Sequence, residues 1–129
     1  MIVRRRGTAI VDTKQGILVA SGHRKLFLLP GGGARHGESR RQATIRELRE
    51  ETGLKAYYWK YLFTYHEPNN PERKVRNLHK VFLIKAYESP KPNHRDVHHI
   101  AFWKPGLEIH LSRTTELIIR KYLEYYKTD

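Results

Sequence analysis

Three glutamates lie at a spacing that could place them together in a catalytic or metal site: Glu50 and Glu51 follow Glu47 by three and four residues. In an α-helix this spacing directs all three side chains into roughly a third of the helix circumference. Like charges at this spacing repel and cost a helix a few tenths of a kcal/mol, so we expect a compensating cation. Mg²⁺ and Mn²⁺ take carboxylate oxygens and keep positions open for water and phosphate groups. The pattern predicts metal-assisted chemistry on phosphates; a solvated acidic helix face is the alternative for these residues alone.

A helix over the segment that follows Ser39 would position the three carboxylates. Ser39 with Gln42 three residues later fits a capping box, which predicts the start of the helix. Gly53 predicts its end. The side opposite the glutamates carries residues at i, i+3 and i+7, as in a stripe laid against a core: Ile45, Leu48 and Thr52.

A strand and a glycine turn precede this helix. Leu26 to Leu29 form an apolar run that predicts a buried strand, and Pro30 ends it. The three glycines from Gly31 to Gly33 let the backbone pass close to a ligand. The expected order is strand, glycine turn, short arm and helix.

The same stretch resembles the motif of the Nudix hydrolase family. The matching residues, each at the motif's spacing, are Gly32, Glu38, Arg46, Glu47, Leu48, Glu50, Glu51, Gly53 and Leu54. The resemblance implies an α+β fold, a three-layer α-β-α sandwich with a central mixed sheet, for which we expect a single domain over residues 1–129. It also implies a MutT-like pyrophosphohydrolase that cleaves a phosphoanhydride in a nucleoside diphosphate-linked substrate with Mg²⁺ or Mn²⁺.

The resemblance also implies roles for particular residues. Glu47, Glu50 and Glu51 would be metal ligands, and the carbonyl of Gly32 would often join them. Arg46 would orient the glutamates through ion pairs, so the catalytic set is Arg46 with the three glutamates. Glu38 would support the site by pairing with Arg46 or by holding a further metal. A structural ion pair is the main role expected for Glu38 and Arg46.

The general base is left open, because it has no fixed place in the family. Family members often present an acid near the end of the chain's second turn-rich linker, and here Asp96 is followed by Val97, His98 and His99. The candidates are Glu67, Glu88 and Asp96. His98 and His99 would point to opposite faces of a strand, so we do not expect them to share a metal.

Composition sets the outer bounds. A chain of 129 residues is long enough to bury one core, and the absence of cysteine excludes disulfides, thiol catalysis and zinc-thiolate sites. Lysine plus arginine number 25 against 13 acids, a net charge of +12 that attracts polyanions. A small phosphate-rich molecule or RNA would fit this charge, as would a basic solvated surface without a partner. No signal peptide or membrane span is visible, so we expect a cytoplasmic protein without membrane partners, either monomer or homodimer.

The remaining segments predict five further strands and a second helix. The strands are Thr8–Val11, Gly16–Ala20, an aromatic-rich run from Ala56 to His66, Arg76–Tyr87, and a short one over Ile100–Trp103 as the last of the sheet. Loops are expected over residues 67–74 and 88–99. Ser112 would cap the helix Arg113–Tyr126, whose inner side would carry Leu117, Ile118, Tyr122 and Tyr125 and cover the sheet face opposite the glutamate helix.

Several basic residues outside the motif are candidates for substrate binding. We select Arg35, Arg76 and His79, although a charged strand rim would account equally for the last two. Arg4, Arg5 and Arg6 could contact phosphate, but they are interpreted chiefly as a frayed, solvated terminus. The aromatic residues between Ala56 and His66 would mostly serve core or sheet surface, with base stacking as the alternative.

Two classes of function follow. The first is hydrolysis of a nucleoside triphosphate or related nucleotide, with dinucleoside polyphosphates, inositol pyrophosphates or RNA 5′ ends as alternative substrates. The second is a domain that binds RNA or a nucleotide without cleaving it. Binding alone does not need three crowded glutamates, so hydrolysis is favoured.

Overall fold

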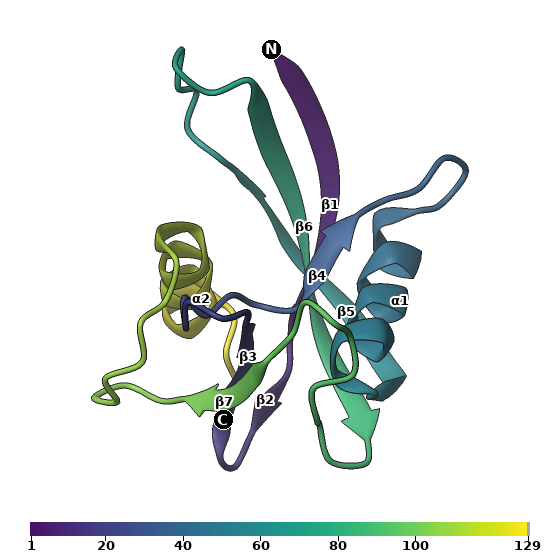
Figure 1. Ribbon diagram of the computed structural model, residues 1–129, viewed down its shortest axis with the longest axis vertical. Coiled ribbons are helices and arrows are strands. Elements are labelled where there is room, and N and C mark those ends of the chain that lie inside the picture. The colour runs from purple at the N-terminus through teal and green to yellow at the C-terminus, as the bar shows by residue number, and fades with distance from the viewer. Residues whose placement is uncertain (129) are drawn as a thin grey trace.

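The computed structural model describes residues 1–128 and has a long sheet at its centre, against which the helices pack (Figure 1). Asp129, the last residue of the predicted domain, lies outside the described residues. The strands are β1 (Ile2–Ile10), β2 (Asp12–Thr13), β3 (Gly16–Ser21), β4 (Gly31–Gly33), β5 (Lys55–His66), β6 (Val75–Tyr87) and β7 (His99–Trp103). The helices are α1 (Arg40–Thr52) and α2 (Arg113–Tyr125).

The central sheet is mixed, as predicted. Its strand order is β4-β1-β6-β5, in which β1 runs parallel to β6 and the other two pairs are antiparallel. The parallel register extends from Ile2 opposite Val75 to Ile10 opposite Leu83. A smaller antiparallel sheet has the order β2-β3-β7.

Consecutive residues of the central strands enter two different cores, which confirms the three-layer arrangement. Ala9 and Phe82 pack with Leu48 of α1, whereas Ile10 and Val81 pack with Ile118 of α2. Because successive strand side chains point to opposite faces, this alternation requires one helix on each side of the sheet. Figure 1 shows α1 and α2 on opposite sides of the central strands.

The predicted strand at Leu26–Leu29 is wrong. Phe27 and Leu28 form only isolated bridges, to Leu111 and Ala20 respectively. The strand at this point is β4, formed by the glycine run, which pairs with Arg6 to Thr8 of β1. The apolar run instead connects the small sheet to the large one. Phe27 and Leu29 pack into the core on the α2 side, whereas Leu26 and Leu28 are exposed. The other predicted strands are present.

The two predicted helices form, with corrections to the faces that they bury. Ser39 and Gln42 make both bonds of the capping box, and Gly53 ends α1 with a left-handed φ of 78°. Ile45 is only half-buried, because Ala43 and Thr44 face the core beside Leu48 and Thr52.

The second helix starts at its predicted cap. Ser112 accepts a hydrogen bond from the Thr115 N–H at 3.2 Å. Ile119 joins Ile118 and Tyr122 in the core, whereas Tyr125 was wrongly assigned to the inner side and is 73% exposed. Within residues 1–128, no helix has the length and apolar character needed to cross a membrane.

Candidate active site

Helix α1 is held against the backbone of β1, and this contact fixes the height of its glutamates over the sheet. A Cβ atom on Gly7 would lie 2.1 Å from the Arg40 carbonyl oxygen and 2.1 Å from Thr44 Oγ1. Only glycine permits this approach. With Leu48 and Thr52 buried, Glu47, Glu50 and Glu51 face away from the α1 core contact.

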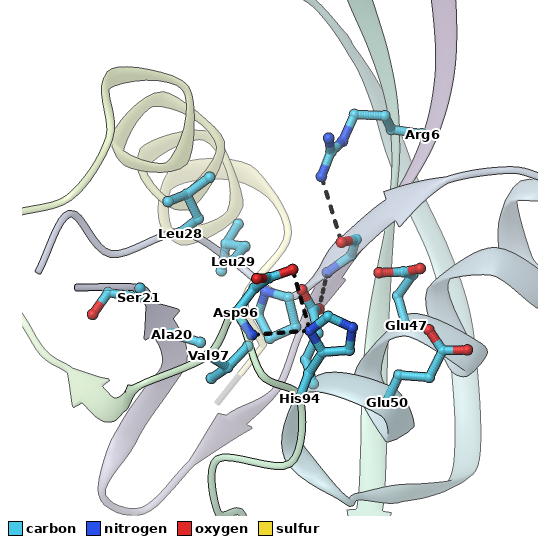
Figure 2. Close-up of a pocket in the computed structure, with 14 residues that line it drawn as sticks. Arg6, Ala20, Ser21, Leu28, Leu29, Glu47, Glu50, His94, Asp96 and Val97 are labelled. Carbon is cyan, nitrogen blue, oxygen red and sulfur yellow. Dashed lines mark hydrogen bonds and ion pairs between the residues drawn. The ribbon is translucent and has the colours of Figure 1, made fainter. Parts of the chain in front are cut away.

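The three glutamates meet at a cavity of about 390 Å³. Figure 2 shows Glu47 and Glu50 on the α1 wall, with Arg6 approaching from β1 and His94 and Asp96 facing them from the loop before β7. The other residues that line the cavity are Ala20, Ser21, Gly22, Leu28, Leu29, Pro30, Gly31, Glu51 and Val97. One end of the cavity is therefore charged, and the other end is largely apolar.

The glycine run of β4 receives two of the carboxylates. The Gly31 N–H donates a hydrogen bond of 2.9 Å to Glu51 Oε1. A Cβ atom on Gly32 would lie 2.6 Å from Glu47 Cδ, so the Glu47 carboxyl group occupies the space that any larger residue would fill. The glycine backbone was predicted to pass close to a ligand, and here it lies close to the carboxyl groups of Glu47 and Glu51.

Glu51 has a strongly perturbed acidity. Burial raises the pKa of its carboxyl group to about 7, and the nearby Glu47 carboxylate adds to the effect, although the Gly31 N–H opposes it. A cation bound beside this carboxyl group would lower its pKa again.

Arg46 links the other acids of the motif. Its Nε and Nη2 donate to the two carboxylate oxygens of Glu38 at 2.8 and 2.9 Å, a bidentate pair. Hydrogen bonds from Arg46 lower the pKa of Glu38 to about 2. Arg46 Nη1 also donates to Glu47 and, at 3.2 Å, to Glu50 Oε2. Arg46 thus contacts all three of these carboxylates, whereas Glu51 has no contact with it among the described bonds.

The donor set has the chemistry that a hard divalent cation needs. Across residues 1–128, no group of three or more His, Cys, Asp or Glu side chains is already gathered around one point to hold a metal ion. Arg46 engages two of the three predicted ligands, which explains why they do not converge. The residues nonetheless fit such an ion, because carboxylate oxygens are its preferred ligands and Gly32 leaves room for the Glu47 carboxyl group.

A loop fastened to the end of α1 brings the remaining polar groups to the cavity. The Asn93 N–H donates to the Glu51 carbonyl oxygen at 3.0 Å, and Asn93 Nδ2 donates to the carbonyl oxygens of Arg49 and Glu50 at 3.2 and 3.3 Å. These bonds satisfy helix-end carbonyls and place His94 and Asp96 in the cavity wall. Asn93 was not among the site residues predicted from the sequence, where only its position among turn residues gave a hint.

Among the three candidate bases, only Asp96 lines the cavity. Its Oδ2 lies 3.5 Å from His94 Nδ1. Glu67 is buried elsewhere, where it accepts a hydrogen bond of 2.8 Å from the Asn77 N–H. Glu88 follows β6 and does not line the cavity.

Arg6 was interpreted as part of a solvated terminus, and that interpretation is wrong. It belongs to β1, lines the cavity and donates from Nη2 to the Gly31 carbonyl oxygen at 3.4 Å. Burial, together with the neighbouring Arg4, lowers the pKa of its guanidinium group. Strand alternation was the available signal, since Arg6 shares a face with Thr8 once β1 is extended back to Ile2.

The predicted substrate-binding residues are divided between two places. Arg35 is exposed and lies 3.7 Å from Glu50, beside the glutamate cluster. His79 and Arg76 do not line the cavity. His79 is buried, with Nδ1 3.0 Å from Thr8 Oγ1 and Nε2 3.4 Å from Glu67 Oε2, and burial lowers the pKa of its imidazole.

Arg76 has a similar structural contact. Its Nε donates to the Glu67 carbonyl oxygen at 2.8 Å. Arg76 and His79 therefore hold Glu67 and the start of the loop that follows β5.

The sequence matches the NUDIX domain family over residues 1–125. A solved structure from Chromobacterium violaceum, named as a nudix hydrolase family member, is 38% identical with a TM-score of 0.81, covering 94% of this chain and 77% of that one. No curated protein sequence matches the chain.

Two more distant structures are similar in fold. A MutT NUDIX hydrolase from Burkholderia pseudomallei is 17% identical with a TM-score of 0.77, covering 93% of this chain and 98% of that one. The NUDIX domain of NrtR from Shewanella oneidensis, complexed with ADP ribose, is 19% identical with a TM-score of 0.74, covering 96% of this chain and 87% of that one.

Proposed function

The chain belongs to the Nudix family of hydrolases, enzymes that act on phosphoanhydrides, and we propose that it is a metal-dependent pyrophosphohydrolase of a nucleoside diphosphate-linked substrate. The observation that carries this proposal is the cavity wall shared by Glu47, Glu50 and Glu51. A domain that only bound nucleotides or RNA would have no need for three carboxylates that repel one another. In this proposal residues 1–129 form one catalytic domain.

The three glutamates and the Gly32 carbonyl group would hold Mg²⁺ or Mn²⁺. Their oxygen donors suit a hard cation, and the raised pKa of Glu51 indicates a carboxylate that would gain from one. When bound, such an ion neutralises charge on phosphate oxygens and makes a water molecule more acidic. Arg46 would position Glu47 and Glu50, and Glu38 would hold Arg46 in place through the bidentate pair.

The two ends of the cavity support the proposed substrate class. Arg6 at the charged end would bind a phosphate of the substrate, and Arg35 would approach the same group from the rim. Ala20, Leu28 and Val97 at the apolar end would contact the nucleoside. The Shewanella domain binds ADP ribose, a nucleoside diphosphate joined to a sugar, which is a molecule of this class.

Asp96 is the general base that we propose. Its carboxylate is exposed to the cavity and would accept the proton of the attacking water as the new oxygen–phosphorus bond forms and the anhydride bond breaks. His94 would hold Asp96 in place by accepting a hydrogen bond of 3.1 Å at Nδ1 from the Asp96 backbone N–H. Asn93 would keep both residues at the cavity by its bonds to the end of α1.

The direct experiment is a substrate panel analysed by chromatography in the presence of Mg²⁺. The panel contains nucleoside triphosphates, ADP-ribose, dinucleoside polyphosphates, an inositol pyrophosphate and 5′-triphosphorylated RNA. Glu51→Gln should lower kcat/KM for the best substrate by more than about 10²-fold, whereas Glu72→Gln, in the exposed loop after β5, should leave it unchanged. Full activity in Glu51→Gln would contradict the metal assignment.

Asp96→Asn separates the base from the metal site. We expect kcat to fall by about 10²-fold or more while Mn²⁺ affinity stays within threefold of the wild type. A normal kcat would exclude Asp96 as the base. The cytoplasmic location and the choice between monomer and homodimer stay predictions from the sequence.

A further inference from the structure

A patch of tyrosines and lysines lies on β5 and β6, outside the cavity. It consists of six exposed side chains, here called the tyrosine–lysine patch: Lys55, Tyr57, Tyr58, Lys60, Lys85 and Tyr87. The β5–β6 register places Tyr58 opposite Lys85 and Lys60 opposite Leu83. Leu83 packs into the α2 core, so these side chains share the sheet face turned away from α1. None of them lines the cavity.

The rings of the patch are accessible and close together. Tyr57, Tyr58 and Tyr87 are 50%, 40% and 61% exposed. The ring centroids of Tyr57 and Tyr87 are 4.4 Å apart at an interplanar angle of 34°, and Lys85 Nζ lies 5.0 Å from the Tyr58 ring. Three partly exposed rings, two packed on each other and the third beside an ammonium group, resemble the stacking platforms on which unpaired bases lie.

The charged side chains within the patch all have one sign. Neither β5 nor β6 contains an aspartate or glutamate, whereas Lys55, Lys60 and Lys85 all belong to the patch. The nearest acid in sequence is Glu88, which follows Tyr87. A protein of net charge +12 with this local arrangement presents a cationic, aromatic surface that is complementary to a polyanion with planar groups.

We propose that the tyrosine–lysine patch binds single-stranded nucleic acid, with bases stacked on the tyrosine rings and phosphates beside the lysines. A second copy of the chain is the other occupant to consider, because β5 is an edge strand of the central sheet. Symmetric pairing of two β5 strands would bring the lysines of one patch close to the lysines of the other, and like charges at close range destabilise such a contact. The charge therefore favours the polyanion.

Fluorescence anisotropy with the full chain and a 5′-fluorescein-labelled 12-nucleotide oligouridine tests the proposal. Tyr57→Ala and Tyr87→Ala should each weaken binding about tenfold, whereas Tyr57→Phe, which keeps the ring, should bind like the wild type. Lys85→Ala should reduce the slope of log affinity against log salt by about 0.7. Arg24→Ala is the control, because it removes the same charge from the exposed β3–β4 connection. In the Arg24→Ala background, Tyr57→Ala and Tyr87→Ala should still weaken oligouridine binding about tenfold.

Two further measurements complete the test. An abasic 12-mer with the same phosphates should bind at least tenfold more weakly than oligouridine, because it lacks bases to stack. Hydrolysis of the best small nucleotide should be unchanged in the patch variants, and their melting temperatures show that they fold. The proposal is overturned if Tyr57→Ala binds oligouridine like the wild type, or if the abasic strand binds equally well. Sedimentation in which the patch variants lose only self-association would identify a second copy as the occupant instead.

Discussion

Replacing Gly32 by alanine should displace the Glu47 carboxyl group while leaving the fold intact. The new Cβ atom would lie 2.6 Å from Glu47 Cδ, and ordinary contact begins near 3.4 Å, so the carboxyl group must retreat by about 0.8 Å. A displacement near 1 Å at a reacting centre costs about 10²-fold in rate. We therefore expect kcat/KM for the best nucleotide, measured with saturating Mg²⁺, to fall by about 10²-fold.

The stability of the Gly32→Ala variant should stay close to that of the wild type. Gly32 does not have a positive φ, and the clashing atoms belong to the flexible end of a side chain, so alanine fits the backbone. Gly7→Ala is the contrasting variant, because its Cβ would meet the Arg40 carbonyl oxygen at 2.1 Å and force β1 away from α1. We expect thermal unfolding to show a melting temperature near the wild type for Gly32→Ala and a large decrease for Gly7→Ala. If a folded Gly32→Ala variant kept wild-type kcat/KM, the claim that activity requires the Glu47 carboxyl group at this position would be refuted.

Three further predictions concern single residues around the cavity. Arg6→Gln removes a guanidinium group that lines the cavity, so steady-state kinetics should show KM raised about tenfold with kcat little changed; an unchanged KM would mean that Arg6 binds no phosphate. Arg46→Lys keeps the charge but loses the bidentate pair with Glu38, and calorimetry should show Mn²⁺ binding about 10- to 100-fold more weakly, whereas wild-type affinity would argue against a positioning role. The pKa of Glu51 is raised to about 7, so between pH 4.5 and 7 the folded metal-free protein keeps a proton that the unfolded chain releases. As pH rises through this window, the free energy of unfolding should therefore fall by up to about 3 kcal/mol. Urea unfolding in EDTA should show this decrease in the wild type relative to Glu51→Gln, and parallel pH profiles would contradict it.

The local signals in the sequence predicted much of the frame. Ser39, Gln42 and Gly53 set the ends of α1 through contacts within a few residues, and such contacts do not depend on the rest of the fold. The alternating and apolar runs predicted the long strands, because the pattern of side chains along a strand is also visible within a few residues. Tyr125 was misassigned because an aromatic residue at a helical spacing fits the inner side, yet it is the last residue of α2 and is 73% exposed.

The features that could not be predicted depend on contacts between distant segments. Arg6 reaches the cavity because β1 extends far beyond its apolar part and pairs with β4. Asn93 acts by its bonds to the end of α1, more than 40 residues earlier in the chain. His79 looked like a surface ligand in a basic cluster, but its position in a parallel strand pair turns it into the interior beside Thr8 and Glu67. Periodicity cannot show such pairings, since they arise only from the topology.

The central claim is that the carboxylates of α1 hold a divalent cation at the wall of the cavity. Anomalous scattering from a crystal soaked with Mn²⁺ and a non-hydrolysable nucleotide analogue tests it most directly. We predict a peak about 2.1 Å from carboxylate oxygens of Glu47, Glu50 and Glu51, with the analogue's phosphates beside Arg6, and no such peak in Glu51→Gln. A peak elsewhere, or Arg46 still bound to Glu47 and Glu50 with no peak at the three glutamates, would contradict the claim.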